Sequence, residues 1–248
     1  MKRVFSVVLA LTLVVALAGT ASAASDPEDP FTATWPAEIQ AEAKEVNPKG
    51  EKIDVLVVID MQKDFIDGAL ANPDAEAIVD NVVAKIEAYK KDGKPIIATL
   101  DTHYDYYLNT QEGKNLPVPH CLRYSDGWLF DKRVGDVLAG YSNLTVLEKP
   151  SFGSRDLVGA IGEYVAAYGE PNVNVEFIGV CTDICVVSNV ITQKTFYPEM
   201  PISLDAACCA AIYPETHEAA LATMTMCQIY ISNWEPKDDV DFGALFGG

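Results

Sequence analysis

The hydrophobic positions of this chain alternate between a buried-strand pattern and a helical pattern. Residues 53–60 form an almost unbroken β-branched run, which is typical of a strand buried on both faces of a parallel sheet. Residues 75–91 carry apolar side chains at helical spacing. Asp92 and Gly93 end this helix, and residues 94–100 predict a second strand. The segment therefore predicts one strand–helix–strand unit.

The same alternation continues almost to the end of the chain. The further predicted strands are 143–148, 173–180, 201–204 and 228–232, and the further predicted helices are 154–168, 183–193 and 214–227. Such alternation predicts an α/β fold, a three-layer αβα sandwich with a mostly parallel central sheet. Ligands of such sheets bind beyond the carboxyl ends of the strands, so functional side chains are expected there.

The beginning of the chain resembles a secretory signal peptide, predicted over residues 1–23. Lys2 and Arg3 precede an apolar run over 4–18, and small residues stand at 21–23, where a leader peptidase would cut. The alternative is an uncleaved membrane anchor, although the run is short beside the roughly 20 residues of a spanning helix. We expect an exported protein, periplasmic or secreted, without stable membrane association after cleavage. Residues 24–50 would be a leader segment and 51–248 a single domain.

Composition and charge narrow the classes of partner and cofactor. The 248 residues are 49% hydrophobic, which suits a globular protein. Eighteen basic against 36 acidic residues give a formal net charge of −18, which would repel nucleic acid. No glycine-rich phosphate motif follows the first predicted strand, so a nucleotide cofactor has no support. The six cysteines all lie in the second half, an arrangement that argues against a disulfide framework but leaves one or two bridges open.

Three predicted strand ends carry an acid, a base and a thiol. Asp60 closes the first strand, Lys149 follows the strand over 143–148, and Cys185 lies just past the strand over 173–180. Singly, Asp60 could cap a turn, Lys149 could be a solvated strand end, and Cys185 could be a small buried hydrophobe. Because all three reach the same edge of the sheet, they predict a catalytic site.

The sequence around Cys185 favours a nucleophile. Thr182 is a candidate N-cap, which would place Cys185 in the first turn of a helix. There the helix dipole and nearby Lys149 would lower the pKa of the thiol. The free N–H groups of this turn could hold an oxyanion, and Asp60 could take the thiol proton and pass it to a leaving amine.

A long polar loop over residues 101–127 holds a second group of candidate residues. Asp101 and His103 alternate along an extended segment, so their side chains point the same way, and His120 follows 17 residues later. Two histidines and one aspartate leave open positions on a metal, as in a catalytic metal site. The alternative is a pair of surface histidines. His217, in the first turn of a predicted helix, is expected to be structural.

Five segments together resemble a known family, the isochorismatase-like cysteine hydrolases, and within it the nicotinamidase-related branch. They are residues 57–65, 101–103, 119–121, 148–154 and 179–186. The resemblance implies the fold of these hydrolases and an Asp/Lys/Cys catalytic triad. In this sequence its members are Asp60, Lys149 and Cys185. It also implies a divalent metal, usually zinc but with manganese or iron as alternatives, bound by Asp101, His103 and His120.

The resemblance extends to the substrate pocket, with one departure. It implies a cis peptide before Cys181, an oxyanion hole made by the backbone N–H groups of Cys181 and Cys185, and Phe65 as the aromatic that stacks on the substrate ring. Nicotinamidases often carry a tryptophan three residues before the second metal histidine, where this chain has Pro117. Nearby tyrosines could replace that aromatic surface or could pack the loop; they are Tyr104, Tyr106 and Tyr107.

The sequence thus predicts a metal-containing cysteine amidohydrolase. It would hydrolyse a small amide, nicotinamide or a relative, through a thioester on Cys185. The alternatives are a vinyl-ether hydrolase of the isochorismatase type and an exported binding protein on a hydrolase scaffold. An oxidising compartment would also allow a disulfide between Cys181 and Cys185 that silences the enzyme. Members of the family often associate, so a homo-oligomer stays open.

Overall fold

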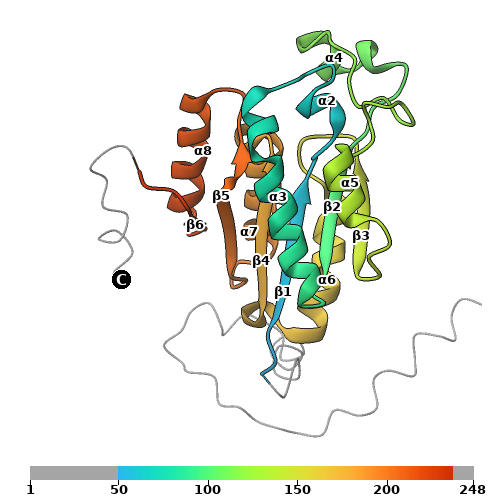
Figure 1. The fold of residues 1–248 in the computed structure, drawn as a ribbon. Helices are drawn as coiled ribbons and strands as arrows, with labels where there is room; N and C mark the ends of the chain where they lie inside the picture. Colours follow the sequence, from blue (N-terminus) through green and yellow to red (C-terminus); the bar gives the residue numbers. More distant parts are fainter. Residues whose placement is uncertain (1–49, 237–248) are drawn as a thin grey trace, which may run out of the picture. The chain divides into compact units, whose positions relative to one another are not determined.

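The computed structural model describes residues 50–236, which fold around one six-stranded sheet. All neighbouring strands are parallel, in the order β3-β2-β1-β4-β5-β6 (Figure 1). The strands are β1 (Ile53–Ile59), β2 (Ile96–Asp101), β3 (Leu144–Lys149), β4 (Val173–Val180), β5 (Ile202–Ala210) and β6 (Tyr230–Ser232). The predicted α/β fold with a parallel sheet is confirmed. The predicted signal peptide, and all but the last residue of the predicted leader, lie outside the described residues.

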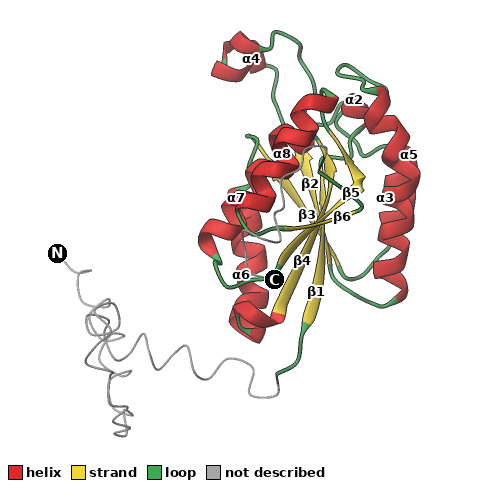
Figure 2. Cartoon of the chain, turned by 90° about the vertical axis from the view of Figure 1, so that its left-hand side faces the viewer, coloured by secondary structure: helices red, strands yellow, loops and turns green. Residues whose placement is uncertain are grey.

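Helices cover both faces of the sheet (Figure 2). One face carries α3 (Pro73–Lys91) and α5 (Lys132–Leu138), and the other carries α6 (Arg155–Tyr168), α7 (Val187–Phe196) and α8 (Pro214–Met226). Because strand side chains alternate, Leu56 and Val58 of β1 pack toward α3, while Val57 and Ile59 pack toward α6 and α7. The core therefore has two halves, and β1 is buried in both, as its apolar run predicts.

Local sequence signals set the ends of the predicted helices. Asn72 caps α3 by accepting a hydrogen bond from the N–H of Asp74 (2.9 Å), with Pro73 at the first helical position. Ser154 caps α6 by accepting from the N–H of Leu157 (3.2 Å). The short helices have weaker patterns and were not predicted. They are α2 (Lys63–Ile66), η2 (Tyr107–Asn109), α4 (Gln111–Asn115), α5 and η3 (Glu170–Asn172).

Strand β5 is longer than predicted, since the sequence indicated only residues 201–204. Its second half begins with Asp205 and continues with alanines and cysteines, which carry little strand signal. The side chain of Asp205 lies 2.9 Å from Nζ of Lys85 and also accepts a hydrogen bond from Asn233 (2.8 Å). These contacts hold a charged residue within the strand, which composition alone does not show.

Gly179, near the end of β4, allows a close approach of two strands. Its φ is +119°, and an added Cβ would lie 2.1 Å from the carbonyl oxygen of Ile59 in β1. A side chain here would push apart the two strands that lead to Asp60 and to Cys185.

Within the described residues, no helix is both long enough and apolar enough to cross a lipid bilayer.

Candidate active site

The three strand-end residues predicted to form a catalytic site are brought together. Asp60 directly follows β1, Lys149 is the last residue of β3, and Cys185 lies in the helical segment after β4. Nζ of Lys149 is 2.7 Å from Oδ2 of Asp60 and 3.5 Å from Sγ of Cys185. All three side chains are buried. The lysine therefore joins the acid and the thiol in one buried cluster.

Asp60 is held at both carboxylate oxygens. The hydroxyl of Thr99 in β2 donates to Oδ1 (2.7 Å) and accepts from the N–H of Asp60 (3.2 Å), while Oδ2 faces Lys149. Burial raises the pKa of Asp60, and the positive charge of Lys149 opposes that rise. Asp60 has a φ of +50°, in the left-handed region where non-glycine residues are uncommon. Its side chain is thus committed to this cluster rather than to capping a turn.

The segment that carries Cys185 differs from the prediction in its helix type. Residues Thr182–Val186 form a π-helical turn, η4, and α7 begins only at Val187. Thr182 is not the N-cap, which is Cys181 without a side-chain cap. The hydroxyl oxygen of Thr182 is instead 3.0 Å from Nδ1 of His217 in α8. This contact is consistent with the structural role expected for His217. π-helical turns are frequent at functional sites.

The expectation of a lowered pKa at Cys185 is wrong for the free site. Burial raises the pKa of this thiol well above its usual value, and the opposing charge of Lys149 is the smaller effect. A thiol with a raised pKa needs a base to take its proton before it can attack a carbonyl carbon. The peptide bond before Cys181 is cis, as the family resemblance implied. The oxyanion-hole role of the Cys181 and Cys185 backbone stays a prediction.

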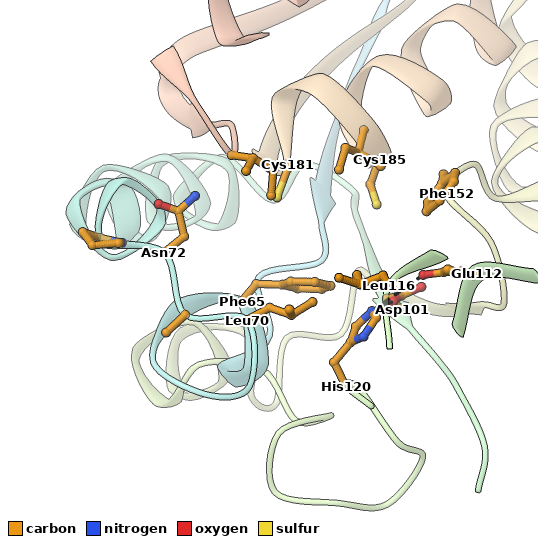
Figure 3. Close-up of a pocket in the computed structure, with 14 residues that line it drawn as sticks. Phe65, Leu70, Asn72, Asp101, Glu112, Leu116, His120, Phe152, Cys181 and Cys185 are labelled. Atoms are coloured by element: carbon orange, nitrogen blue, oxygen red, sulfur yellow. Dashed lines mark ion pairs between the residues drawn. The ribbon is translucent and has the colours of Figure 1, made fainter. Parts of the chain in front are cut away.

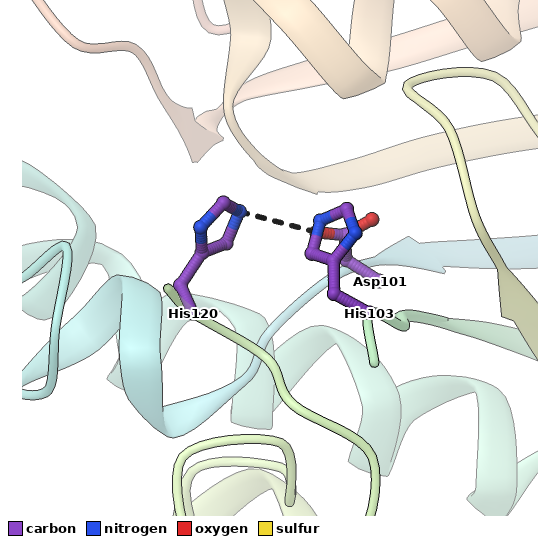
Figure 4. Close-up of side chains that lie close together, drawn as sticks. All are labelled: Asp101, His103 and His120. Atoms are coloured by element: carbon purple, nitrogen blue, oxygen red, sulfur yellow. Dashed lines mark ion pairs between the residues drawn. The ribbon is translucent and has the colours of Figure 1, made fainter. Parts of the chain in front are cut away.

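The predicted metal ligands also converge. Asp101 ends β2, and one ligand atom from each of Asp101, His103 and His120 lies within 4.8 Å of the others (Figure 4). Nδ1 of His120 is 2.8 Å from the carbonyl oxygen of Val118, which leaves Nε2 facing Asp101 at 3.5 Å. Fixing one ring nitrogen on a carbonyl is the usual way in which a protein orients a metal-binding histidine.

The cluster fits a divalent metal by its donors and by its charge. Nε2 of His103 is buried without a hydrogen-bond partner among the described residues, although Oδ2 of Asp101 is only 2.9 Å away. Burial lowers the pKa of His103, but the carboxylates of Asp101 and Glu112 outweigh it and raise the pKa to about 9. The cluster therefore attracts positive charge, and two imidazole nitrogens with carboxylate oxygens are ligands that suit zinc.

Glu112 is a member of this cluster that the sequence reasoning missed. Its Oε1 lies 3.5 Å from Nε2 of His103 and 3.8 Å from Nε2 of His120. It lies in α4, which packs closely on η2 because Gly113 has no side chain; an added Cβ would be 2.1 Å from the carbonyl oxygen of Tyr107. The glycine next to an acid is the signal that could have indicated it, but only the folded loop shows which way Glu112 points.

A cavity of about 400 Å³ lies over both clusters (Figure 3). Cys181 and Cys185 stand on one side of it, and Phe65 and Leu70 on the other, with Asp101 and His120 at one end. The lining residues are Phe65, Leu70, Ala71, Asn72, Pro73, Asp101, Glu112, Leu116, His120, Phe152, Cys181, Ile184, Cys185 and Ile212. A bound molecule would therefore meet the thiol and the metal ligands at the same time.

The aromatic residues of the loop divide into two roles. Phe65 lines the cavity, with its ring 5.7 Å from that of His120, as expected for a substrate-binding side chain. Tyr107 is buried behind the site, with its ring 4.6 Å from that of His103, and Tyr104 stacks on Tyr106 near the surface. None of these three tyrosines lines the cavity, so they pack the loop. Leu116 and Phe152 line it instead, and neither was predicted as a pocket residue.

Gln62 positions Asp101 through its backbone. This fully buried side chain accepts a hydrogen bond from the N–H of Asp101 (2.7 Å) and donates to its carbonyl oxygen (2.9 Å). It also donates to the carbonyl oxygen of Trp128 (2.8 Å). The amide of Gln62 thus holds the end of β2 against the segment that contains Trp128. From there the Asp101 carboxylate reaches both Lys149 and the histidines.

We expect Gln62→Met to weaken zinc binding by about 10- to 100-fold, because supporting residues of metal ligands have effects of this size. Isothermal titration of the metal-free protein measures it. The control is Gln193→Met: Gln193 is fully buried, and neither side-chain polar atom has a hydrogen-bond partner among the described residues. That variant should keep the zinc affinity of the unmodified protein. Equal zinc affinity in the two variants would contradict the role given to Gln62.

Comparison with known proteins gives the family of the chain and agrees with its fold. The described residues form an α/β protein whose parallel sheet carries a thiol, an acid and metal-type ligands at the ends of its strands, beside one cavity. Residues 54–236 match the family model described as the Isochorismatase domain. The chain therefore belongs to the isochorismatase-like hydrolase family. No curated protein sequence matches it.

Solved structures of similar fold include several amidases. A nicotinamidase from Bacillus subtilis is 23% identical with a TM-score of 0.63, covering 73% of this chain and 99% of the other. A pyrazinamidase of Pyrococcus horikoshii, in complex with zinc, is 25% identical with a TM-score of 0.61 and covers 73% and 99%. An N-carbamoylsarcosine amidase from Thermoplasma acidophilum is 21% identical with a TM-score of 0.56 and covers 76% and 99%.

Proposed function

We propose that the protein is a metal-containing cysteine amidohydrolase that hydrolyses a small amide, nicotinamide or a relative, through a thioester. One observation carries the proposal: Nζ of Lys149 contacts both Asp60 and Cys185 beside a cavity that is also lined by Asp101 and His120 of the metal-type cluster. The names of the similar structures, nicotinamidase, pyrazinamidase and N-carbamoylsarcosine amidase, support an amide as the substrate class.

The reaction would begin with the neutral thiol of Cys185. Asp60 takes its proton, and Sγ attacks the amide carbonyl carbon to form a carbon–sulfur bond. Asp60 then gives the proton to the amide nitrogen, the carbon–nitrogen bond breaks, and ammonia leaves a thioester. A water molecule, deprotonated by Asp60, attacks that thioester, and the acid product leaves while the thiol recovers its proton. One water is consumed for each amide.

Lys149 would stay charged throughout. Although burial opposes it, the charges of Asp60 and Asp101, together with that of Cys185 when it is a thiolate, raise the pKa of Lys149 well above its usual value. A fixed cation at 3.5 Å from Sγ stabilises the thiolate as it forms, and its contact with Asp60 keeps that base in place.

A divalent metal would be held by Asp101, His103 and His120, with Glu112 beside them. It would supply a Lewis acid that receives a lone pair of the substrate and so orients the amide toward Cys185. Asp101 connects this cluster to the catalytic one, because its Oδ1 lies 3.2 Å from Nζ of Lys149 while Oδ2 faces the histidines.

Ammonia release and acid quenching test the proposal together. Zinc-loaded protein is mixed with nicotinamide, and ammonia is measured enzymatically. Rapidly quenched samples are analysed by mass spectrometry, and we expect the acyl group on the peptide that contains Cys185. Protein stripped of metal by a chelator should lose most of the ammonia release. If a panel of small amides is bound without any ammonia or acylated Cys185, the binding-protein alternative replaces this function.

A further inference from the structure

The end of the cavity away from the metal cluster is apolar. Three of the polar lining residues, Asp101, Glu112 and His120, belong to that cluster. Figure 3 shows the cavity continuing past Phe65 and Leu70 toward Asn72. The large apolar side chains of the wall are Phe65, Leu70, Leu116, Phe152, Ile184 and Ile212.

The polar side chain at that end is already occupied. Nδ2 of Asn72 donates to the carbonyl oxygen of Ala211 (2.7 Å), and its Oδ1 accepts from the N–H of Asp74 (2.9 Å). Nδ2 is thus engaged by the segment after β5, and Oδ1 by the start of α3. These two contacts fix the orientation of the amide.

Away from the metal cluster, the cavity has no cation to receive an anionic group of a substrate. Among the described residues that line it, none is lysine or arginine. Lys149, beneath the thiol, is fully buried and paired with Asp60 and Asp101 at 2.7 and 3.2 Å. The charged side chains of the lining, Asp101 and Glu112, are acidic. A carboxylate placed at the end away from the metal cluster would exchange water for apolar side chains without gaining a partner, which is costly.

The cavity is larger than one aromatic ring requires. An apolar cavity of about 150 Å³ holds benzene, and this one measures about 400 Å³. The additional volume cannot all be assigned to the reacting amide, which is small. It leaves room for a further apolar group against Leu70, Ile184 and Ile212.

We propose that the site selects uncharged amides whose acyl group is apolar and larger than a single six-membered ring, and that it excludes amides that carry a carboxylate. The inference rests on the proposed function, since it names the substrate class of the same site. It follows from three features: the apolar wall, the occupied amide of Asn72 and the absence of an available cation among the lining residues.

Three matched compounds test this selectivity: nicotinamide, its analogue with a second ring fused to the first (a quinoline carboxamide), and its analogue with a carboxylate on a ring carbon that is not next to the nitrogen. Their kcat/KM values are measured with the zinc-loaded protein. We expect the fused-ring amide to exceed nicotinamide by at least about tenfold, since even one methylene in an apolar pocket gives about that factor. The carboxylated amide should fall at least about a hundredfold below nicotinamide, as expected for a charge buried without a partner.

Binding to the Cys185→Ala variant separates this inference from the proposed function. Dissociation constants of the three compounds are measured by calorimetry, where turnover plays no part. The affinities could follow the expected order, with the fused-ring amide bound most tightly and the carboxylated amide least tightly, while the unmodified protein releases no ammonia. That result would contradict the proposed function and leave the selectivity standing. Equal affinities, or tighter binding of the carboxylated compound, would overturn the selectivity whatever the catalytic result.

Adding a cation to the wall gives a second test. Ile212→Arg should raise the preference for the carboxylated amide over nicotinamide by about tenfold or more, because Ile212 lines the cavity. The control is Tyr230→Arg, at an exposed position of β6 that does not line it; there the preference should not change. The same shift in both variants would show only a general effect of charge and would contradict the inference.

Discussion

Cys185→Ala is expected to abolish amide hydrolysis while the protein stays folded. Loss of a covalent nucleophile lowers kcat by about 10⁴-fold or more, because no other group can form the acyl intermediate. The fold should tolerate the change. The backbone carbonyl of Cys185 keeps its hydrogen bond from Asn189 (2.7 Å), whose Oδ1 accepts from the N–H of Ser154. Ammonia release and thermal unfolding measure the two effects.

The matched control for this prediction is Cys209→Ala. Cys209 is also a buried cysteine, but it lies in β5 and does not line the cavity. Its replacement should remove a similar amount of packing and leave kcat within about twofold, as expected when a buried atom outside the reaction is lost. Retained turnover in the Cys185 variant would refute the nucleophile. Equal loss of activity in both variants would instead point to damage to the fold.

The fold and the catalytic residues could be predicted because they follow from regular structure. The β-branched run over 53–60 indicates a buried strand, and parallel strands bring their carboxyl ends together whatever the distance between them in the sequence. Asp60, Lys149 and Cys185 therefore had to meet at one edge. Asp101 and His103 were predicted only as residues of a long loop; Asp101 in fact ends β2, the strand between β1 and β3, which brings both residues beside the catalytic cluster.

The remaining features depend on loop geometry and on burial, which the sequence does not encode simply. Glu112 reaches the histidines only because α4 packs on η2, and this packing also places Leu116 in the wall of the cavity. The pKa of Cys185 was predicted in the wrong direction, because the dipole of a helix start is visible in the sequence and desolvation is not. The π-helical turn was missed for a similar reason, since its residues fit an ordinary helix.

Lys149→Met should produce the largest loss of stability among single substitutions in the site. The methionine fills a similar space, but Asp60 and Asp101 are left buried without their shared cation. Removing one partner of a buried ion pair typically costs about 3–5 kcal/mol.

The control is Lys85→Met. Lys85 also joins two carboxylates, Glu176 at 2.7 Å and Asp205 at 2.9 Å, but it is partly exposed. Its loss should cost about 1 kcal/mol. Urea unfolding at neutral pH measures both, and equal costs would contradict the special role of Lys149.

The stability deficit of Lys149→Met should shrink as the pH falls. In the unmodified protein burial already raises the pKa of Asp60, and Lys149 opposes the rise; without the lysine the folded-state pKa moves higher still. At a pH below that raised pKa, Asp60 is protonated in the folded state, whereas in the unfolded state it binds the proton only near its ordinary pKa. Stability relative to the unmodified protein is therefore recovered toward acid pH. A deficit that is constant with pH would show that lost packing, not buried charge, is the cause.

A second substitution separates the structural role of Lys149 from its catalytic role. Adding Asp60→Asn to Lys149→Met removes one of the two uncompensated carboxylates, so about half of the lost stability should return at neutral pH. Activity should not return, because the double variant lacks both the base and the cation that stabilises the thiolate. If activity rose together with stability, Lys149 would act only by holding the site together. If neither rose, Asp101 rather than Asp60 would be the carboxylate that depends most on the lysine.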